Sequence, residues 1–140
     1  MIDTREGFET YLHDFNSGDF YAFVPKYYAE DAIFEKTGFT IHGAGNLADH
    51  FSTVLSSVVK ETITLVNYVK QGDLVAVELQ IELTAVADGF YIRERKKGET
   101  EIFYDAGWYG IKDGKIAHAR VYRRFADANT VDLVKTYGGK

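Results

Sequence analysis

The sequence contains no cysteine, one proline and one methionine, and its 140 residues carry a formal net charge of −5. The absence of cysteine excludes disulfide bonds, thiolate nucleophiles and zinc–thiolate sites, and it fits a reducing compartment. The negative charge disfavours non-specific binding to nucleic acid, which requires clustered lysine and arginine. No run approaches the roughly 18 apolar residues of a membrane-spanning helix, and the N-terminal segment lacks the basic-then-apolar order of a signal peptide. We therefore expect a cytoplasmic protein that does not interact with membranes.

Aromatic residues, by contrast, are abundant: the chain has ten phenylalanines, ten tyrosines and one tryptophan. Each buried tyrosine hydroxyl needs a hydrogen-bond partner, so ten tyrosines indicate either a tyrosine-lined pocket or a hydrated oligomer interface. The length predicts a single domain over residues 1–140, with a core at about 4–127 and a C-terminal tail at 128–140.

Three segments in the first part of the chain have the apolar spacing of amphipathic helices. The first follows Asp3 and Glu6, which resemble a capping box. Its apolar stripe consists of Phe8, Tyr11, Leu12 and Phe15. The second segment follows Asp19 as a cap and contains Pro25, which should split or kink the helix. The third segment follows Asn46 as a cap.

The apolar period changes from that of a helix to that of a strand after residue 60. Four strands are expected, at residues 63–69, 75–84, 100–111 and 115–125. Asp113-Gly114 is a strong two-residue hairpin signal between the last two. A short hairpin is expected at 32–42, and the basic cluster at 93–98 is interpreted as a solvated turn. Helices followed by an antiparallel meander predict an α+β fold.

The last strand separates its side chains by parity into two faces. The apolar face carries Ala117, Ala119, Val121 and Phe125. The polar face carries His118, Arg120, Tyr122 and Arg124. Arg123 has the parity of the apolar face. A lone arginine on a core-facing surface suggests a lined cavity rather than a solid interior.

Three segments occur in a characteristic order: FNSGDF from Phe15, YYAEDAIFE from Tyr27 and KDGKIAHARVY from Lys112. With them the sequence resembles the nuclear-transport-factor-two-like superfamily, in particular its SnoaL-like branch, over about residues 8–127. The resemblance implies one SnoaL-like domain, in which three N-terminal helices close a curved antiparallel sheet into a cone around a central cavity. It does not specify a reaction, because the superfamily includes isomerases, cyclases, dehydratases, epoxide hydrolases, transport adaptors and non-catalytic binders.

The ketosteroid isomerases of this superfamily allow a comparison residue by residue. Tyr11 matches their oxyanion-hole tyrosine, and Asp105 lies near their second oxyanion donor. Lys36 occupies the position of their catalytic carboxylate, so the resemblance does not support steroid isomerisation. Val121 stands where the limonene-type epoxide hydrolases have an aspartate, so it does not support that chemistry either.

We predict Asp105, Tyr11 and Arg123 as the catalytic residues. Asp105 is expected among aromatic side chains, where a desolvated carboxyl group is suited to proton transfer or to hydrogen-bond donation as a neutral acid. Tyr11 and Arg123 would stabilise negative charge on oxygen. The alternatives are an Asp105 that binds backbone or pairs with Arg123, an Arg123 paired with Asp105 or Glu35, and a Tyr11 that only packs.

Further residues are expected to contact a ligand. Lys36 is a candidate base, Schiff-base amine or substrate clamp, unless it points into water as a hairpin lysine. His50 is expected at the cavity rim. The other predicted binding residues are Phe15, Tyr28, Phe51, Leu79, Tyr109 and Val121. The four histidines lack metal-ligand spacing, so no metal site is expected.

These observations leave two hypotheses for the function. The first is an enzyme that acts without a cofactor on a hydrophobic, carbonyl-containing molecule by proton transfer, as in isomerisation, cyclisation or dehydration. The second is a non-catalytic module that binds a small molecule or a protein. The acidic face of residues 78–82 and the basic face of residues 118–124 also favour a homodimer through the convex face of the sheet.

Overall fold

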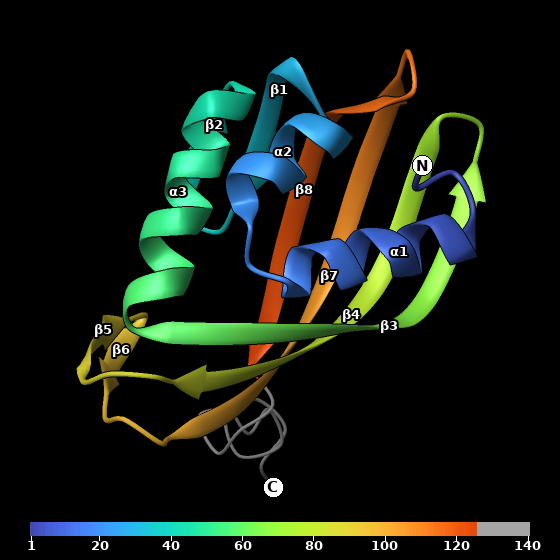
Figure 1. Cartoon of the computed structure of the whole chain (residues 1–140). Helices are drawn as coiled ribbons and strands as arrows, with labels where there is room; N and C mark the ends of the chain where they lie inside the picture. Colours follow the sequence, from blue (N-terminus) through green and yellow to red (C-terminus); the bar gives the residue numbers. More distant parts are fainter. Residues whose placement is uncertain (126–140) are drawn as a thin grey trace, which may run out of the picture.

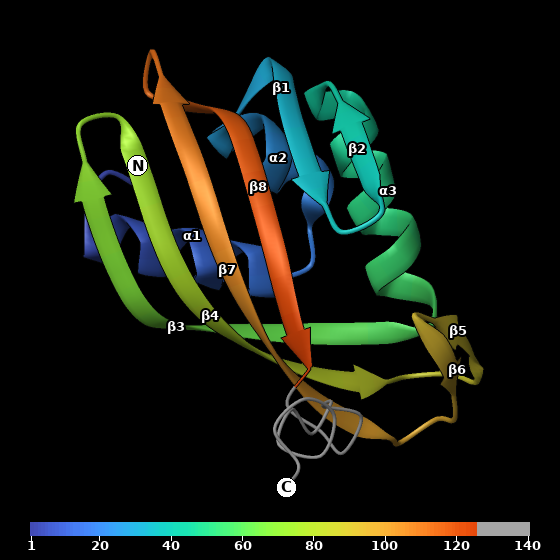
Figure 2. The same ribbon diagram turned by 180° about the vertical axis from the view of Figure 1, so that it is seen from behind.

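The computed structural model describes residues 1–125 of the chain, so the expected tail at 128–140 and the side chain of Phe125 lie outside the described part. Three helices, α1 (Arg5–Asn16), α2 (Phe20–Tyr27) and α3 (Ala44–Ser57), cover one face of a large curved sheet (Figure 1). The opposite face of the sheet carries no helix from this part of the chain (Figure 2). The expected α+β architecture with three N-terminal helices is confirmed.

The main sheet has six strands in the order β2-β1-β8-β7-β4-β3. The strands are β1 (Tyr28–Lys36), β2 (Phe39–His42), β3 (Val59–Gln71), β4 (Leu74–Ala85), β7 (Thr100–Lys112) and β8 (Lys115–Phe125). The predicted antiparallel meander corresponds to β3, β4, β7 and β8. Parity alone did not predict that β1 pairs with β8, or that this pairing is parallel. The sheet is therefore mixed, and it is open rather than closed as a barrel.

The helices are anchored by their caps and by aromatic packing. Thr4, and not Asp3, caps α1, because its hydroxyl accepts a hydrogen bond from the Gly7 amide at 2.9 Å. Asp19 caps α2 as predicted. The α3 helix begins two residues before Asn46, whose amide instead donates to a preceding carbonyl.

The buried stripes of α1 and α2 face the sheet and each other. They consist of Phe8, Tyr11, Leu12, Phe15, Phe20, Phe23, Val24 and Tyr27. Pro25 lies inside α2 and does not split it, and the helix ends two residues later. The Lys115 ammonium group donates to the carbonyls of Pro25 and Lys26 at 2.6 and 3.1 Å, which satisfies this helix end.

The parity of β8 holds from Ala119 onward, where Ala119 and Val121 are buried. Nearer the hairpin it is shifted by one residue. Ile111 pairs with Ile116 while Gly110 pairs with His118, so Ala117 is the extra residue of a bulge and Ile116 is buried in its place. The prediction that Ala117 belongs to the core face was wrong for this reason.

Candidate functional site

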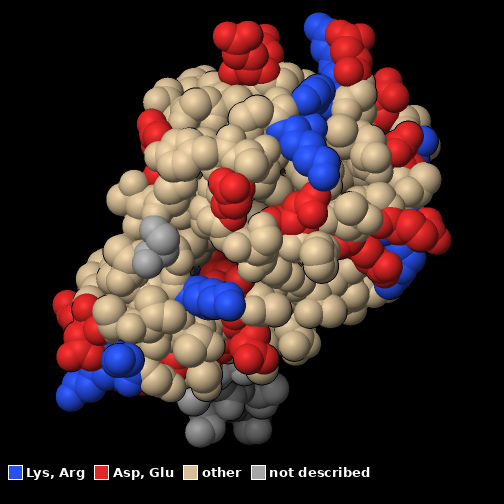
Figure 3. Space-filling view, in the orientation of Figure 1, with Lys and Arg blue, Asp and Glu red and all other residues tan. Residues whose placement is uncertain are grey.

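A cavity of about 560 Å³ lies between α3, the β1–β2 turn, β8 and a small hairpin. The hairpin consists of β5 (Gly89–Tyr91) and β6 (Arg93–Arg95). This outer cavity is lined by Lys36, Thr37, Phe39, His50, Thr53, Val54, Ser57, Val58, Phe90, Tyr91, Ile92 and Arg123. Its volume is in the range of small-molecule sites. Acidic and basic side chains lie interspersed over the helical face of the molecule rather than in blocks of one sign (Figure 3).

A second, inner cavity of about 50 Å³ lies deeper in the cone, between α1 and the sheet. It is lined by Tyr11, Leu12, Phe15, Phe34, Lys36, Phe51, Glu61, Ile63, Leu79, Asp105, Tyr109, Val121 and Arg123. The structure thus brings together all the predicted site residues except Tyr28 and His50 around this small space. Lys36 and Arg123 are shared by both cavities and lie between them.

Arg123 is held by two carboxylates in the interior. Its Nε and Nη2 donate to the two carboxylate oxygens of Asp105 at 2.9 and 3.2 Å, and Nη2 also donates to Glu61 Oε2 at 3.3 Å. The three side chains are each 4–6 % exposed. Burial opposes the guanidinium charge, but hydrogen bonding to Asp105 and the charge of Glu61 outweigh burial and raise the pKa of Arg123. The guanidinium also lies 4.6 Å from the centroid of the Phe103 ring.

This arrangement changes the interpretation of Asp105. The carboxylate is buried as expected, but both its oxygens accept hydrogen bonds from Arg123, and it lines the inner cavity rather than the outer one. The contacts of Asp105 therefore match the alternative in which it forms a structural pair with Arg123. Glu61 was not predicted as a site residue, although it has the same parity as Ile63 and Leu65 and faces the same interior.

Lys36 is half-buried at the end of β1, where it lies opposite Val121 of β8. Its ammonium group makes no hydrogen bond or ion pair with residues 1–125. Burial, followed by the positive charge of Arg123, lowers the pKa of this amine. The hairpin lysine thus lines the cavities rather than pointing only into water.

His50 reaches the outer cavity from α3, as predicted for a rim residue. Its ring centroid lies 5.0 Å from that of Phe39. Burial, followed by the charge of Lys36, lowers the pKa of His50 below its ordinary value of about 6.5, so the imidazole is neutral at pH 7.

Tyrosines form a buried network on the other side of the inner cavity. The Tyr11 and Tyr28 hydroxyls are 2.7 Å apart, and the ring of Tyr109 lies 6.1 Å from that of Tyr11. Burial raises the pKa of all three phenols, so they act as hydrogen-bond donors in their neutral form. A Cβ at Gly107 would lie 2.7 Å from the Tyr109 ring, so glycine provides the space for this ring.

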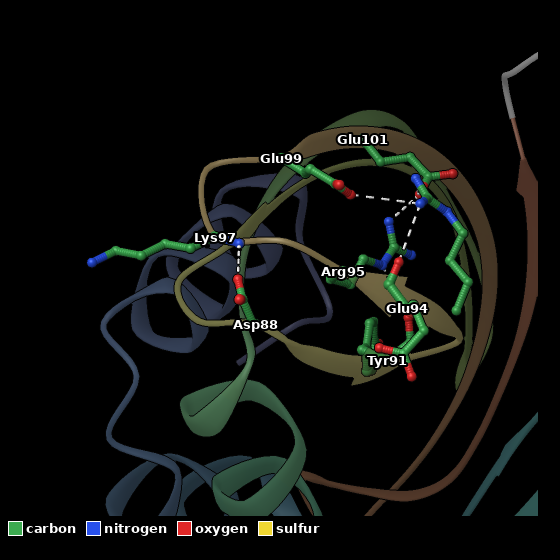
Figure 4. Close-up of polar contacts among 8 residues, drawn as sticks. Asp88, Tyr91, Glu94, Arg95, Lys97, Glu99 and Glu101 are labelled. Atoms are coloured by element: carbon green, nitrogen blue, oxygen red, sulfur yellow. Dashed lines mark hydrogen bonds and ion pairs between the residues drawn. The ribbon is translucent and has the colours of Figure 1, made fainter.

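The β5–β6 hairpin supplies the wall of the outer cavity that sequence analysis missed. Residues 93–98 were interpreted as a solvated turn, but Arg95 is 2 % exposed and bonds to Glu101 of β7 and to the Tyr91 carbonyl. Figure 4 shows this clamp together with a second contact, in which the Lys97 amide donates to Asp88 at 2.9 Å. The base of the hairpin is therefore fixed to the main sheet.

The free end of this hairpin presents apolar side chains to the outer cavity. Phe90 and Ile92 line it although they are 67 % and 44 % exposed, and Ile92 has a φ of 67°, which is unfavourable for a β-branched residue. Tyr91 lies between these two residues in the sequence, and burial raises its pKa to about 12. The run of strand-favouring residues Phe90, Tyr91 and Ile92 was the available signal for a short strand here.

Among residues 1–125 no group of three or more histidine, aspartate or glutamate side chains is placed to hold a metal ion. No helix within these residues is long and apolar enough to cross a membrane.

Comparison with known proteins shows what this fold resembles. A candidate polyketide cyclase from Pseudomonas putida KT2440 is 25 % identical, with a TM-score of 0.67, covering 85 % of this chain and 87 % of that one. A LEH-like epoxide hydrolase from M. tuberculosis is 20 % identical with a TM-score of 0.67, covering 85 % and 80 %. A candidate polyketide cyclase from Streptomyces antibioticus is 19 % identical with a TM-score of 0.65, covering 80 % and 85 %. No functionally curated protein matches the sequence.

The comparison with protein families covers most of the cone, from the first buried residue of α1 to the middle of β8. The model of the SnoaL-like domain matches residues 8–119. These residues include most of α1, the other two helices and most of the mixed sheet that forms the two cavities. The chain belongs to the SnoaL-like domain family, as its sequence motifs and its fold had indicated.

Proposed function

We propose that this protein is an enzyme that transfers a proton on a hydrophobic, carbonyl-containing molecule bound in the outer cavity, as in isomerisation, cyclisation or dehydration. The observation that carries the proposal is the composition of that cavity. Two cationic side chains, Lys36 and Arg123, and one neutral imidazole, His50, meet in a space whose remaining walls are mainly apolar. The candidate polyketide cyclases among the structural neighbours are consistent with such a substrate.

In this proposal His50 accepts the proton and Arg123 stabilises the enolate oxygen. A neutral imidazole with its pKa lowered is suited to take a proton from the carbon next to a carbonyl group. Arg123 is a suitable electrostatic partner because Asp105 and Glu61 fix its orientation before any ligand binds. Asp105 then acts as a positioning residue for Arg123. Such chemistry needs only a base and an electrophilic donor.

The experiment is hydrogen–deuterium exchange on a panel of uncharged aromatic ketones in D₂O, followed by NMR of the protons next to the carbonyl. The protein should accelerate exchange, and His50→Gln should reduce the rate by about 10²–10⁴-fold. The matched control is His13→Gln, since His13 is exposed on α1 and outside both cavities. The exchange rate should also fall as the pH drops through the pKa of His50, which burial and the charge of Lys36 place below the ordinary imidazole value.

The second candidate function is a non-catalytic binding module, and the pairing of Asp105 with Arg123 favours it. These interior charges satisfy each other without a ligand, which is what a structural cluster requires. A module of this kind would bind the aromatic ketones, as measured by calorimetry, without accelerating exchange. Exchange at the uncatalysed rate for every bound ketone would therefore reject the enzyme and retain the binder.

A further inference from the structure

The amine of Lys36 lies in a cavity wall and lacks the partner that a structural charge would have within residues 1–125. It lies in the wall shared by the two cavities and makes no ion pair or hydrogen bond within residues 1–125. Other lysines near the cone have conventional roles. Lys26 binds Asp14 at 2.8 Å, and Lys115 donates to the end of α2. Lys36 has no such role in the described fold.

The surroundings explain why this amine lacks a partner. The carboxylates whose charges act on it, Glu61 and Asp105, are engaged by Arg123, so they attract Lys36 without binding it. The guanidinium places a second positive charge beside the amine. A lysine that is desolvated next to another cation holds a larger neutral fraction, and the neutral amine is the nucleophile.

We propose that Nζ of Lys36 forms an imine with the carbonyl carbon of an aldehyde or ketone bound in the outer cavity. The inference rests on the proposed function and deepens it, because it names the reacting group of the substrate and a covalent intermediate. The substrate class is an uncharged aromatic or polycyclic carbonyl compound. Phe39, Phe90 and Ile92 offer apolar contacts to its rings, while Lys36 lies at the inner end of the cavity.

The proposed reaction balances without an oxidant or a reductant. The nitrogen lone pair attacks the carbonyl carbon, and a proton moves from nitrogen to oxygen to give a carbinolamine. The C–O bond then breaks, the oxygen leaves as water after taking up one proton from solvent, and the nitrogen lone pair forms the C=N bond. The product is an iminium ion and one water molecule. Its positive charge acidifies the neighbouring C–H group, from which neutral His50 removes a proton to give an enamine.

The test is reductive trapping with 2-naphthaldehyde and sodium cyanoborohydride at pH 7, followed by intact-mass measurement and peptide mapping. Hydride reduces the imine to a secondary amine, so each label adds the mass of the aldehyde less one oxygen. We expect Lys36 to carry the dominant label, well above an exposed lysine such as Lys70, since burial and the charge of Arg123 lower the pKa of Lys36 and so raise its neutral fraction. Even labelling of all lysines would overturn the proposal.

Variants of the full chain separate the site from general reactivity. Lys36→Met should abolish the dominant label, while Lys70→Met, the matched control at an exposed position, should retain it. Lys36→Arg keeps the charge but forms no imine, so it too should remain unlabelled. Circular dichroism of each variant confirms folding. A dominant label that persists in a folded Lys36→Met or Lys36→Arg variant would refute the assignment.

The trapping and exchange experiments fail in different ways. If the wild-type protein catalyses deuterium exchange but stays unlabelled, and if Lys36→Met does not slow the exchange, the imine is rejected and proton transfer by His50 remains. Labelling of Lys36 with exchange at the uncatalysed rate would support the imine and reject the proposed proton transfer. Absence of both would reject both.

Discussion

The buried cluster of Arg123, Asp105 and Glu61 gives the sharpest prediction for stability. Asp105→Asn keeps the shape of the side chain but removes the negative charge that faces the Arg123 guanidinium, which is 6 % exposed. Removing one partner of a buried ion pair typically costs about 3–5 kcal/mol, because it leaves a charge buried without compensation. Glu61 remains 3.3 Å from Nη2 and the asparagine oxygen still accepts a hydrogen bond, so we expect the lower end, about 3 kcal/mol.

The assay is urea unfolding followed by circular dichroism, with thermal melting as a second measurement. A loss of about 3 kcal/mol should lower the melting temperature by roughly 10 °C in a chain of this size. The matched control is Glu99→Gln. The Glu99 side chain is 40 % exposed, and its carboxylate lies 3.6 Å from Arg93. That change should cost less than about 1 kcal/mol, as is usual for surface ion pairs. If Asp105→Asn costs no more than Glu99→Gln, Arg123 is not held as we describe.

Three other predictions follow from packing, titration and the exposed sheet face. Gly107→Ala should destabilise the protein by about 1–3 kcal/mol in urea unfolding, because the new Cβ would lie 2.7 Å from the Tyr109 ring. The control is Gly45→Ala, whose Cβ meets no atom within 4 Å and should not destabilise the protein. Because burial raises the pKa of Tyr11 in the folded state, the unfolded state ionises first. Stability should thus be retained below about pH 10 and lost above it, with tyrosinate absorbance rising together with loss of circular dichroism. Ionisation of every tyrosine near pH 10 with the fold intact would contradict the buried network. Finally, we propose a homodimer through the sheet face that carries no helix from residues 1–125, where Tyr122 is 56 % exposed. Wild-type protein should sediment as a dimer at micromolar concentration and Tyr122→Glu as a monomer, and a single-chain mass for the wild type would reject the dimer.

Local patterns in the sequence predicted the fold well where each strand pairs with its neighbour in the chain. Period-two alternation located β4, and the Asp113-Gly114 turn placed β7 beside β8. The pairing of β1 with β8 was not predictable in this way, because parallel strands that are remote in sequence share no turn.

The candidate site was predicted in part for a similar reason. Parity placed Asp105 and Arg123 on one face, but it did not reveal that the carboxylate is occupied by the guanidinium. The β5–β6 hairpin escaped prediction because its strands are three residues long, which is too short for periodicity to be recognised. Arg95 was misjudged because a charged side chain is rarely fully buried, and the Glu101 partner that makes this possible lies in the next strand.

The parallel pairing of β1 and β8 also bears on how the cavity is assembled. It sets Lys36 opposite Val121, so the amine and the neighbouring guanidinium meet only when the two strands associate. Contacts between remote segments form slowly, because the intervening loop must close before they contribute any stability. A nascent chain whose β8 residues are still inside the ribosome therefore has the Lys36 amine but not the Arg123 guanidinium beside it. The reactivity toward carbonyl compounds that we propose for Lys36 should consequently appear at the end of folding.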